Sequence, residues 1–457
     1  MNDYQDNGRT LKTYQRFCRA VLLPLGDRVF GQRVSSRFKE LLDFQWKSEE
    51  EIACYRHSQL RDLLRFCNNR VPYYREVFRD ADLSVEALAE FTEKELAQLP
   101  ILTKQHLRER FSDLKTTGFR GPVTTMMSSG STGAQTATLV DKSCFDEVYA
   151  TQLLFWSWGH FFMGARHLQT GMSLKRGFLR TLKDRLFLCN YVSAFGLQDA
   201  DLNRIVNLLR RRKIRAVFGY ASSIYVIASF LKRQGVVLPM DSIFTWGDSL
   251  FPHYRELVEE VFSCRVNDCY GLGEGIQCAA QCEHHDALHE AMNGVITEIV
   301  DPKGQPCDYG ELGRVIVTRL VPGAMPLIRY DTGDMAYFVE GKCDCNRNLR
   351  RISRIQGRST DIVTTPGGDR LIVHFFTQIF EVVKEIRQFQ VRQNEPESIL
   401  VSYIPGDGFS LGVLEKIRSS ILGKCTYPLK IQFQQVGEIP LEKSNKRRFV
   451  ISKVPLQ

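Results

Sequence analysis

The sequence MSSGSTGAQTATLV, residues 127–140, places six Ser, Gly and Thr residues in a row before it returns to residues typical of a strand. Such a run lacks the side chains that build a core. Consecutive backbone amides and hydroxyls can surround an anion, and Gly-rich turns commonly bind phosphate. The same residues also suit the turn of a β-hairpin. This stretch alone therefore leaves two interpretations, a phosphate loop or a plain hairpin turn.

The segments on either side differ in pattern. Residues 1 to about 115 have helical periodicity, which Pro72 interrupts. From about Val123, strand-like runs at 214–220 and 241–247 alternate with helical segments. That alternation predicts βαβ units and a largely parallel sheet.

The pattern changes twice more toward the C-terminus. Residues 294–340 are rich in strand-like runs, and a compact α+β pattern follows Gly357. We therefore predict an α/β fold with a large domain over residues 1–357, which includes a β-rich subdomain and a helical N-terminal region of about 1–115. A small α+β domain over residues 358–457, joined by a hinge, completes the prediction.

The composition is ordinary for a globular protein: 43% of the 457 residues are apolar and 25% are charged. No apolar run is long enough to span a bilayer, and the N-terminus has no apolar signal-peptide region. The 13 cysteines are scattered, which argues against a disulfide framework. We expect a cytoplasmic protein.

The net charge of +9 is spread along the chain, with its densest cluster at 210–213. This cluster closes an amphipathic helix, where cations are favourable, so we interpret it as a solvated helix end. No zinc finger or RNA-binding signature is present, and we expect no nucleic-acid partner. A mild attraction to anionic substrates or to an anionic membrane surface is compatible with the charge.

The Ser/Gly run resembles the phosphate loop of adenylate-forming (AMP-binding) enzymes, in particular the phenylacetate–CoA ligase-like group. That group includes the adenylating proteins of capsular polysaccharide biosynthesis. Further motifs that resemble those of the family follow in its order: LPILTKQHLRERF at 99–111, DCYGLGEG at 268–275, MPLIRYDTGD at 325–334, RIQGRSTD at 354–361 and IPLEKSNKRRFVIS at 439–452. The resemblance covers nearly the whole chain.

The resemblance implies a two-step reaction. A carboxylate attacks the α-phosphate of ATP and gives an acyl-adenylate and pyrophosphate, and a second nucleophile, often the thiol of coenzyme A, then takes the acyl group. Between the steps, the small C-terminal domain of such enzymes rotates about the hinge. The implied cofactors are ATP and Mg²⁺, and possible acceptors include coenzyme A.

The resemblance also implies roles for individual residues in nucleotide binding. In the loop, hydroxyls and close-approaching glycines would hold the β- and γ-phosphates, although Ala134 stands where relatives often carry Lys. Asp334 would accept the two ribose hydroxyls, because a carboxylate has only acceptor oxygens. The implied cofactor-binding residues are Ser128, Ser129, Gly130, Ser131, Thr132, Gly133, Gly247, Asp248, Ser249, Tyr270, Gly271, Asp334 and Arg358.

Two residues match the catalytic positions of the family. Lys446 corresponds to the C-terminal lysine, whose ammonium would stabilise charge between the attacking carboxylate and the α-phosphate, with Lys443 as a rival. Glu274 matches the carboxylate that coordinates magnesium. At the hinge, either Thr360 or Asp361 could be the pivot.

A metal site is indicated by the spacing of soft ligands. Cys282 and His289 precede the C-x-C pair Cys343 and Cys345, a spacing typical of structural zinc, and related sequences carry a similar arrangement. Four protein ligands would leave no open coordination position, which favours a structural role over a catalytic one. Rival ligands are Cys278, His284 and His285. The alternative is a set of reduced, buried thiols without metal.

Three functional hypotheses remain after this reading. The first is an AMP-forming acid–thiol ligase that acts on a small-molecule acid. The second is an adenylating enzyme of surface-polysaccharide biosynthesis that passes the acyl group to an amino sugar or a carrier. The third is a catalytically inactive scaffold of that pathway. A homodimer is possible, and the sequence does not identify the acid. The aromatic run at 155–162 is interpreted as packed core rather than as an acid pocket.

Overall fold

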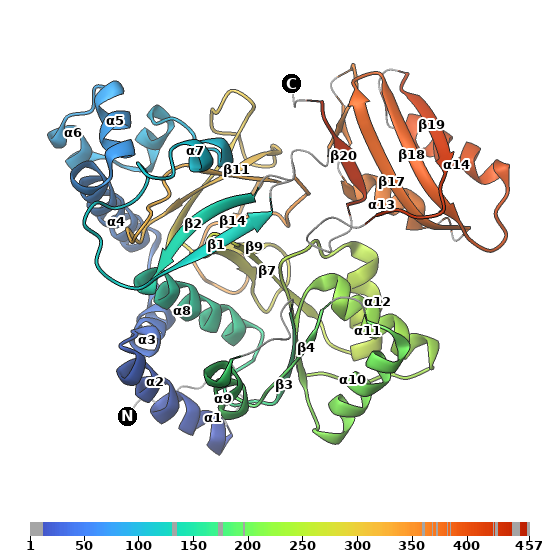
Figure 1. Cartoon of the computed structure of the whole chain (residues 1–457), viewed down its shortest axis with the longest axis horizontal. Helices are drawn as coiled ribbons and strands as arrows, with labels where there is room; N and C mark the ends of the chain where they lie inside the picture. Colours follow the sequence, from blue (N-terminus) through green and yellow to red (C-terminus); the bar gives the residue numbers. More distant parts are fainter. Residues whose placement is uncertain are drawn as a thin grey trace.

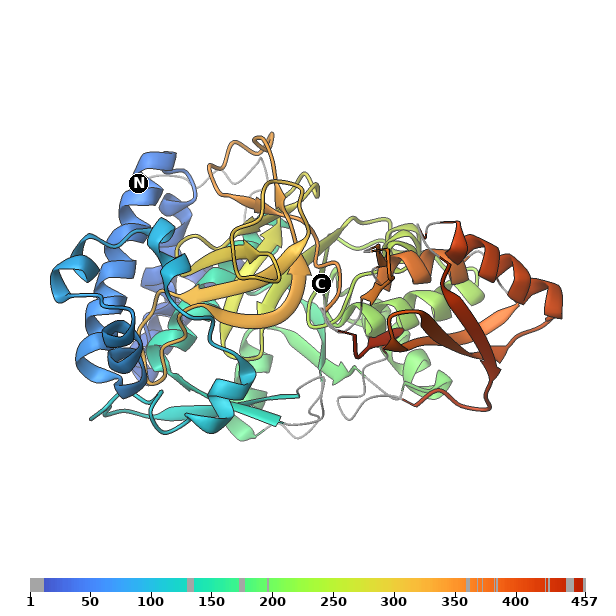
Figure 2. The same cartoon turned by 90° about the horizontal axis from the view of Figure 1, so that it is seen from above.

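The computed structural model describes residues 12–129, 135–171, 177–194, 197–358, 362–367, 369–371, 373–381, 383, 385–423, 425, 428–440 and 448–454. The described chain forms a large α/β body and a smaller α+β unit that lies to one side of it (Figures 1 and 2). No helix of the described residues is both long and apolar enough to cross a membrane.

The N-terminal region is helical, as predicted. Ser48 caps the longest of these helices: its hydroxyl accepts from the Glu51 amide at 3.2 Å, while Glu51 accepts from the Ser48 amide at 2.9 Å. Pro72 occupies the first turn of the next helix and ends the preceding one. The elements are α1 Thr13–Phe17, η1 Cys18–Leu22, α2 Leu23–Phe30, α3 Val34–Phe44, α4 Glu49–Arg70, α5 Pro72–Asp80, α6 Val85–Glu90, η2 Glu93–Gln98 and α7 Lys104–Glu109.

A nine-stranded sheet organises the large body, in the order β13-β14-β9-β8-β7-β6-β5-β3-β4. Its parallel half, with predicted βαβ connections, consists of β3 His167–Gly171, β4 Cys189–Ser193, β5 Ala216–Gly219, β6 Ser242–Thr245 and β7 Val266–Leu272. The other half is antiparallel and consists of β8 Ile276–Gln281, β9 Leu288–Glu290, β13 Phe338–Val339 and β14 Arg351–Ile352. The α/β class is confirmed, but the sheet is mixed rather than largely parallel. Strands β8 and β9 follow β7 through short turns that need no crossover helix, and β14 pairs antiparallel with β9 after the chain has passed through a separate sheet.

Helix α8 Lys142–Trp158 packs against β8 in the antiparallel half of the sheet. The helices of the parallel half are α9 Phe178–Leu186, α10 Asp199–Arg211, α11 Ala221–Arg233 and α12 Pro252–Phe262. The aromatic run at 155–162 is core, as interpreted, since Phe155, Trp158 and Phe161 are buried. The basic cluster at 210–213 follows the amphipathic α10, whose apolar side chains are buried. Two further sheets complete the large body: the hairpin β1 Val123–Ser129 and β2 Gln135–Asp141, and the antiparallel β10 Val295–Val300, β11 Gly313–Arg319 and β12 Tyr330–Ala336.

The C-terminal unit has its own sheets and its own core. A short pair, β15 Val363–Thr364 and β16 Arg370–Leu371, is followed by α13 Val373–Glu381. A four-stranded sheet, in the order β19-β18-β17-β20, contains β17 Ile386–Glu395, β18 Ser398–Pro405, β19 Lys430–Gln435 and β20 Val450–Ser452, with α14 Leu411–Leu422 packed beside it. Phe251, just before α12, packs into this core, with its ring 5.2 Å from that of Phe449. The unit therefore rests against the parallel half of the large body (Figure 1).

Candidate active site and cysteine cluster

The predicted nucleotide-binding residues of the large body lie where parallel strands end. Gly247 and Ser249 follow β6, and Tyr270 lies near the end of the neighbouring β7. Because the carboxyl ends of parallel strands share one edge of the sheet, these residues are brought together there, where ligands of open α/β sheets commonly bind. Gly247 has a φ of +80°, and a Cβ at this position would lie 2.7 Å from the Tyr220 ring, so a side chain cannot be accommodated.

Asp248 is engaged in local structure. Its carboxylate accepts from the amides of Ala221 and Ser222 at 2.6 and 3.2 Å and from the Ser222 hydroxyl. These contacts cap the N-terminus of α11. The carboxylate therefore holds the loop after β6 against the loop after β5.

Asp334, in the predicted ribose position, contacts two other predicted residues. The Tyr270 hydroxyl donates to Asp334 Oδ2 at 2.8 Å, and Arg358 Nε lies 3.7 Å from Asp334 Oδ1. The backbones of Asp334 and Arg358 also form an isolated antiparallel bridge, which links β12 to the end of the large body. The Asp334 side chain is 16% exposed, so it remains accessible from solvent. The three residues thus form an acidic, aromatic and cationic group from three distant parts of the sequence.

Glu274 lies in the turn between β7 and β8 and is buried. Its Oε1 accepts from the Tyr330 hydroxyl at 2.8 Å, and burial raises the pKa of Tyr330, as does the neighbouring Glu274 charge. Arg319 donates to the Glu274 backbone carbonyl at 3.3 Å, which fixes the turn. Tyr330 and Arg319 were given no role from sequence, although Tyr330 stands inside the quoted 325–334 motif.

The electrostatics of the two carboxylates are linked. Burial raises the pKa of Asp334, while Arg358 and the Tyr270 hydrogen bond lower it. The negative charge of Glu274 raises the pKa of Asp334 further. Two nearby carboxylates in a partly buried site favour the binding of a cation or of hydrogen-bond donors.

Two basic residues of α7 lie near this site and were not singled out from sequence. Lys104 Nζ donates to the Thr332 carbonyl at 3.2 Å, and its charge lowers the pKa of Asp334. Arg108 Nη1 donates to Thr136 Oγ1 of β2 at 3.2 Å. They are four residues apart on a helix and therefore share one face. Both belong to the quoted 99–111 motif, where this i, i+4 spacing of cations was the available signal.

Several predicted residues lie outside the described residues: Gly130, Ser131, Thr132, Gly133, Thr360, Asp361, Lys443 and Lys446. Ser128 and Ser129 belong to β1, where only their backbone is described. Strands β1 and β2 pair antiparallel, with Ser129 opposite Gln135. The described residues on either side of the Ser/Gly run therefore form a hairpin, and the phosphate-loop interpretation stays a prediction.

The structure brings together Cys282, His289, Cys343 and Cys345, whose ligand atoms all lie within 4.8 Å of one another. The Cys282 and Cys343 sulfurs are 3.7 Å apart, and His289 Nε2 is 3.4 Å from the Cys345 sulfur. In a tetrahedral site with Zn–S and Zn–N bonds of ordinary length, ligand atoms are separated by about 3.4–3.8 Å. All four residues are buried. Three thiols and one imidazole are a donor set that suits zinc.

The surroundings of the cluster orient its ligands. Hydrogen bonding from Cys282 and then from His289 lowers the pKa of Cys345 to about 2, whereas the same contact raises the pKa of Cys282. His289 also packs edge-on against Trp158, and Arg347, in the loop after Cys345, stacks over the same indole at 5.0 Å.

The rival ligands are not members of this cluster among the described residues. His285 Nδ1 lies 3.1 Å from the Val266 carbonyl, and burial lowers the pKa of its imidazole to about 4. Burial raises the pKa of the Cys278 thiol, as do the charges of Asp334, Glu290 and Glu274.

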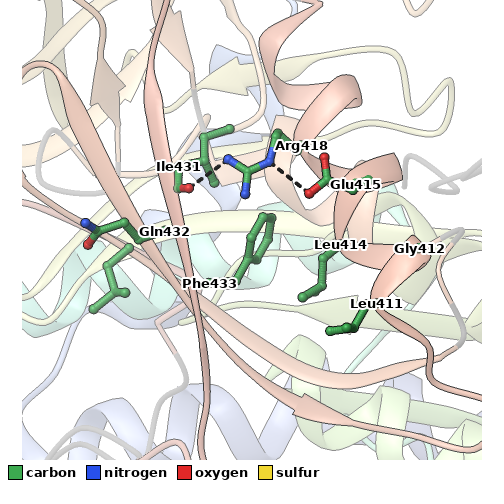
Figure 3. A pocket seen from close by; sticks show the side chains of 9 residues that line it. Leu411, Gly412, Leu414, Glu415, Arg418, Ile431, Gln432 and Phe433 are labelled. Carbon is green, nitrogen blue, oxygen red and sulfur yellow. Dashed lines mark hydrogen bonds and ion pairs between the residues drawn. The ribbon is translucent and has the colours of Figure 1, made fainter.

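The C-terminal unit carries a shallow surface pocket between α14 and β19 (Figure 3). Arg418 crosses it, donating to the Ile431 carbonyl at 2.8 Å and to Glu415 at 3.3 Å. Its lining contains none of the predicted site residues: Leu400, Leu411, Gly412, Leu414, Glu415, Arg418, Ile431, Gln432 and Phe433. This pocket is therefore separate from the candidate active site.

Comparison with known proteins gives relatives for most of the chain. It is 25% identical over 335 residues to a phenylacetate-coenzyme A ligase of Thermus thermophilus, covering 70% of this chain and 73% of the relative. It is 28% identical over 374 residues to a phenylacetate-coenzyme A ligase of Pseudomonas putida, covering 77% and 80%. Residues 363–453 match the family model of the CapK C-terminal domain.

The fold is similar to that of a solved 2-hydroxyisobutyryl-CoA ligase in complex with R3-HIB-AMP. The TM-score is 0.72, with 17% identity, over 89% of this chain and 91% of that one. Sequence relatives and fold agree with the motif order read from the sequence. The chain is therefore similar in sequence to phenylacetate-coenzyme A ligases over 70% or more of its length, and residues 363–453 match the CapK C-terminal domain.

Proposed function

We propose that this protein is an AMP-forming acid–thiol ligase, which joins a carboxylic acid to AMP and then transfers the acyl group to coenzyme A. The observation that carries the proposal is the group formed by Asp334, Tyr270 and Arg358 at the carboxyl edge of the parallel strands. Its residues are those that the family resemblance assigns to the nucleotide. Curated relatives over 70% or more of the chain are named as phenylacetate-coenzyme A ligases, which supports the same reaction class.

In this proposal, Asp334 accepts hydrogen bonds from the ribose hydroxyls. Its two oxygens suit two adjacent donors. Arg358 neutralises the carboxylate and contributes a donor to the nucleotide. Gly247, Asp248, Ser249, Tyr270 and Gly271 border the adenine, and Lys446 of the small domain stabilises the charge that develops on the α-phosphate. The small domain, residues 358–457, moves about a hinge at Thr360 or Asp361.

The phosphates of ATP would be held by the Ser/Gly run at 128–133. Ala134 leaves that run without the lysine that relatives often carry. Lys104 and Arg108 of α7 supply positive charge in the same region, since Arg108 contacts Thr136, three residues after the run. We propose that these two side chains take over the contact to the departing pyrophosphate.

Glu274 would hold Mg²⁺. A buried carboxylate beside a second carboxylate fits a hard divalent cation, and the cation would offset the repulsion that raises the pKa of Asp334. When bound, the cation supplies charge neutralisation for the phosphates. Glu274 would be kept in place by Tyr330 and by the Arg319 contact to its carbonyl.

Cys282, His289, Cys343 and Cys345 would hold a structural Zn²⁺. Their donor chemistry and separations fit the ion, and four protein ligands leave no position open for substrate. The ion would tie the loop at 343–345 to the antiparallel half of the sheet. We assign it to stability rather than to the reaction, in a protein that works in the cytoplasm, where ATP and coenzyme A are available.

A second acceptor remains a candidate because of one observation, the CapK C-terminal domain match at 363–453. In that case the adenylation step is the same, but the acyl group passes to an amino sugar or a carrier protein. An inactive scaffold would perform neither step.

Carboxylate-dependent ATP–pyrophosphate exchange tests the proposal. The purified protein with Mg²⁺ would be given aromatic, fatty, hydroxy and amino acids in turn. We expect exchange with one acid class, and an acyl-CoA product once coenzyme A is added. Exchange without thioester formation would favour the amino-sugar or carrier acceptor. Absence of exchange with every acid, from protein that still binds ATP, would contradict the proposal and favour the scaffold.

A further inference from the structure

The N-terminal helices α1, η1 and α2 form a continuous helical run from Thr13 to Phe30 that exposes one apolar stripe. Its members recur at intervals of three and four residues, which places them on one side of the run. Their exposed fractions rise from 38% at Tyr14 to 65% at Val29. The stripe consists of Tyr14, Phe17, Val21, Leu25 and Val29.

Helix α9 exposes a second apolar stripe, led by Phe178, which is 81% exposed. Its other members are Leu179, Leu182 and Leu186, again at helical spacing. The two stripes are adjacent: the Tyr14 hydroxyl donates to the Leu186 carbonyl at 2.7 Å, and α9 lies beside α1 in the view of Figure 1. Together they form what we call the amphipathic face.

Isolated exposed apolar residues are ordinary, but two adjacent stripes are not. A globular protein gains free energy by covering such a face, so these helices would be expected to pack inward unless something else covers them. Among the described residues, the side chains of the two stripes remain exposed.

Basic residues surround the amphipathic face. Residues 12–33 carry five Lys or Arg and one Asp, and α9 carries three Lys or Arg and one Asp. The single acid of the first segment, Asp27, accepts from the Val34 and Ser35 amides and so serves the start of α3. Seven of these eight basic residues are exposed: Lys12, Arg16, Arg28, Arg33, Arg180, Lys183 and Arg185.

We propose that the amphipathic face docks the protein on an anionic lipid bilayer. Helices with an apolar stripe bordered by Lys and Arg lie in the plane of a bilayer, with apolar side chains among the acyl chains and cations at the headgroups. A second copy of the chain is a poorer occupant, because a twofold contact would bring the basic residues of one copy close to those of the other. This inference concerns attachment and does not depend on the proposed reaction.

Vesicle co-sedimentation of the full chain tests this proposal. One set of vesicles contains equal parts of phosphatidylglycerol and phosphatidylcholine, and the other contains phosphatidylcholine alone. We expect binding to the first set that weakens with added salt, and much weaker binding to the second. Comparable binding to both sets, independent of salt, would overturn the role of the basic residues.

Paired variants localise the contact. Leu25→Ser with Val29→Ser, and Phe178→Ser with Leu182→Ser, should each reduce the bound fraction about tenfold, because each removes two inserted side chains. Arg180→Gln with Arg185→Gln should weaken binding to the anionic vesicles alone. The matched control is Val237→Ser with Leu411→Ser, which changes two other exposed apolar residues, 59% and 75% exposed, and should bind as the parent does.

Sedimentation velocity separates the remaining outcomes. All these substitutions are at exposed positions, and thermal melts should show that the variants stay folded. If the parent is a dimer that the stripe variants dissociate, and if it does not bind vesicles, the face is a subunit interface and the proposal is wrong. Equal vesicle binding by the stripe variants and the control pair would also overturn it.

Discussion

The candidate active site and the cysteine cluster both use residues of the nine-stranded sheet, on strands β7 and β9 that flank β8, yet they are built in opposite ways. Tyr270 of β7 is paired across the ladder with Ala279, and His289 of β9 with Ala280. Paired residues of neighbouring strands point to the same face, whereas the successive residues Ala279 and Ala280 point to opposite faces. The side chains of Tyr270 and His289 therefore lie on opposite faces of the sheet. Tyr270 contacts Asp334 of β12, whereas His289 packs on Trp158 of α8.

The two sites also differ in closure. The active-site group keeps solvent access, with Arg358 33% and Asp334 16% exposed, and it has donors and acceptors that a ligand could engage. The four members of the cysteine cluster are buried, and their ligand atoms lie within 4.8 Å of one another. One sheet can therefore carry both an accessible site that could bind substrate and a buried cluster that could stabilise the fold. The following predictions test that division by their effects on ATP–pyrophosphate exchange.

The largest effect on exchange is expected for Lys446→Ala. Loss of one charged group that stabilises a transition state lowers the rate by about 100-fold or more. Exchange assays of this variant and of Lys443→Ala check the prediction. Equal loss in both variants, or greater loss in Lys443→Ala, would transfer the role to Lys443.

Asp334→Asn should raise the KM for ATP by about 10- to 100-fold, because charge-assisted hydrogen bonds to the ribose are replaced by weaker ones. Asp308→Asn, at an exposed turn, is the control and should leave the KM unchanged. Steady-state kinetics at varied ATP measure the effect. An unchanged KM in Asp334→Asn would remove the ribose role.

Lys104→Gln should lower exchange by a smaller factor, about 3- to 10-fold, since one positive contact near the phosphates is lost while the stem of the side chain is kept. The neighbouring exposed Gln105→Ala is the control. The lower exchange rate of Lys104→Gln should be measured over a range of pyrophosphate concentrations. A loss confined to the KM for the acid would instead assign Lys104 to the acyl pocket.

The acid limb of the pH profile, in which ATP affinity falls as the pH is lowered, should reflect protonation of Asp334. Burial raises the pKa of Asp334 above the ordinary value, so ATP affinity should fall as the pH drops through that raised pKa and the carboxylate is protonated. Arg358 is the main group that lowers this pKa, so Arg358→Gln should move the limb to higher pH. Tyr270→Phe should move it in the same direction by less.

Arg314→Gln provides the control for that shift, because Arg314 pairs with Asp331 rather than with Asp334. Its acid limb should coincide with that of the parent. A limb that does not move in Arg358→Gln would show that another group titrates.

The smallest effect on exchange is expected for the cysteine cluster. Cys345→Ser should abolish bound zinc, measured by elemental analysis, and lower Tm by on the order of 5 °C or more. Exchange by the protein that stays folded should remain within about twofold of the parent. Cys54→Ser, at an exposed position, should keep both zinc and Tm.

If Cys345→Ser loses exchange activity in proportion to its loss of bound zinc, at temperatures where it remains folded, the purely structural role of the cysteine cluster would be wrong. The metal would then serve the reaction as well as the fold. Protein purified without metal, with an unchanged Tm after added zinc, would support buried thiols instead.

The amino-acid sequence alone predicts the α/β class, the helical N-terminal region, and the strands and helices of the C-terminal unit. These features follow from local hydrophobic periodicity and from Pro and Gly residues at the ends of helices and strands. It also indicated the four soft ligands, since cysteine and histidine spacing carries the chemistry of zinc. Motif order indicated the resemblance to adenylate-forming enzymes. These patterns depend on composition or on residues close together in the sequence, so they can be recognised without knowledge of the tertiary contacts.

The contacts that the candidate site residues make with one another are seen only in the three-dimensional structure. Tyr270 and Asp334 are 64 residues apart in sequence and share a hydrogen bond, and Lys104 reaches the carbonyl of Thr332 across 228 residues. The tertiary structure also decided that Asp248 caps α11, that the sheet turns antiparallel after β7, and that the stripes of α1, η1, α2 and α9 lie together. The physical reason is the same in each case: long-range contacts depend on how the faces of distant elements pack, and local sequence periodicity does not specify which faces meet.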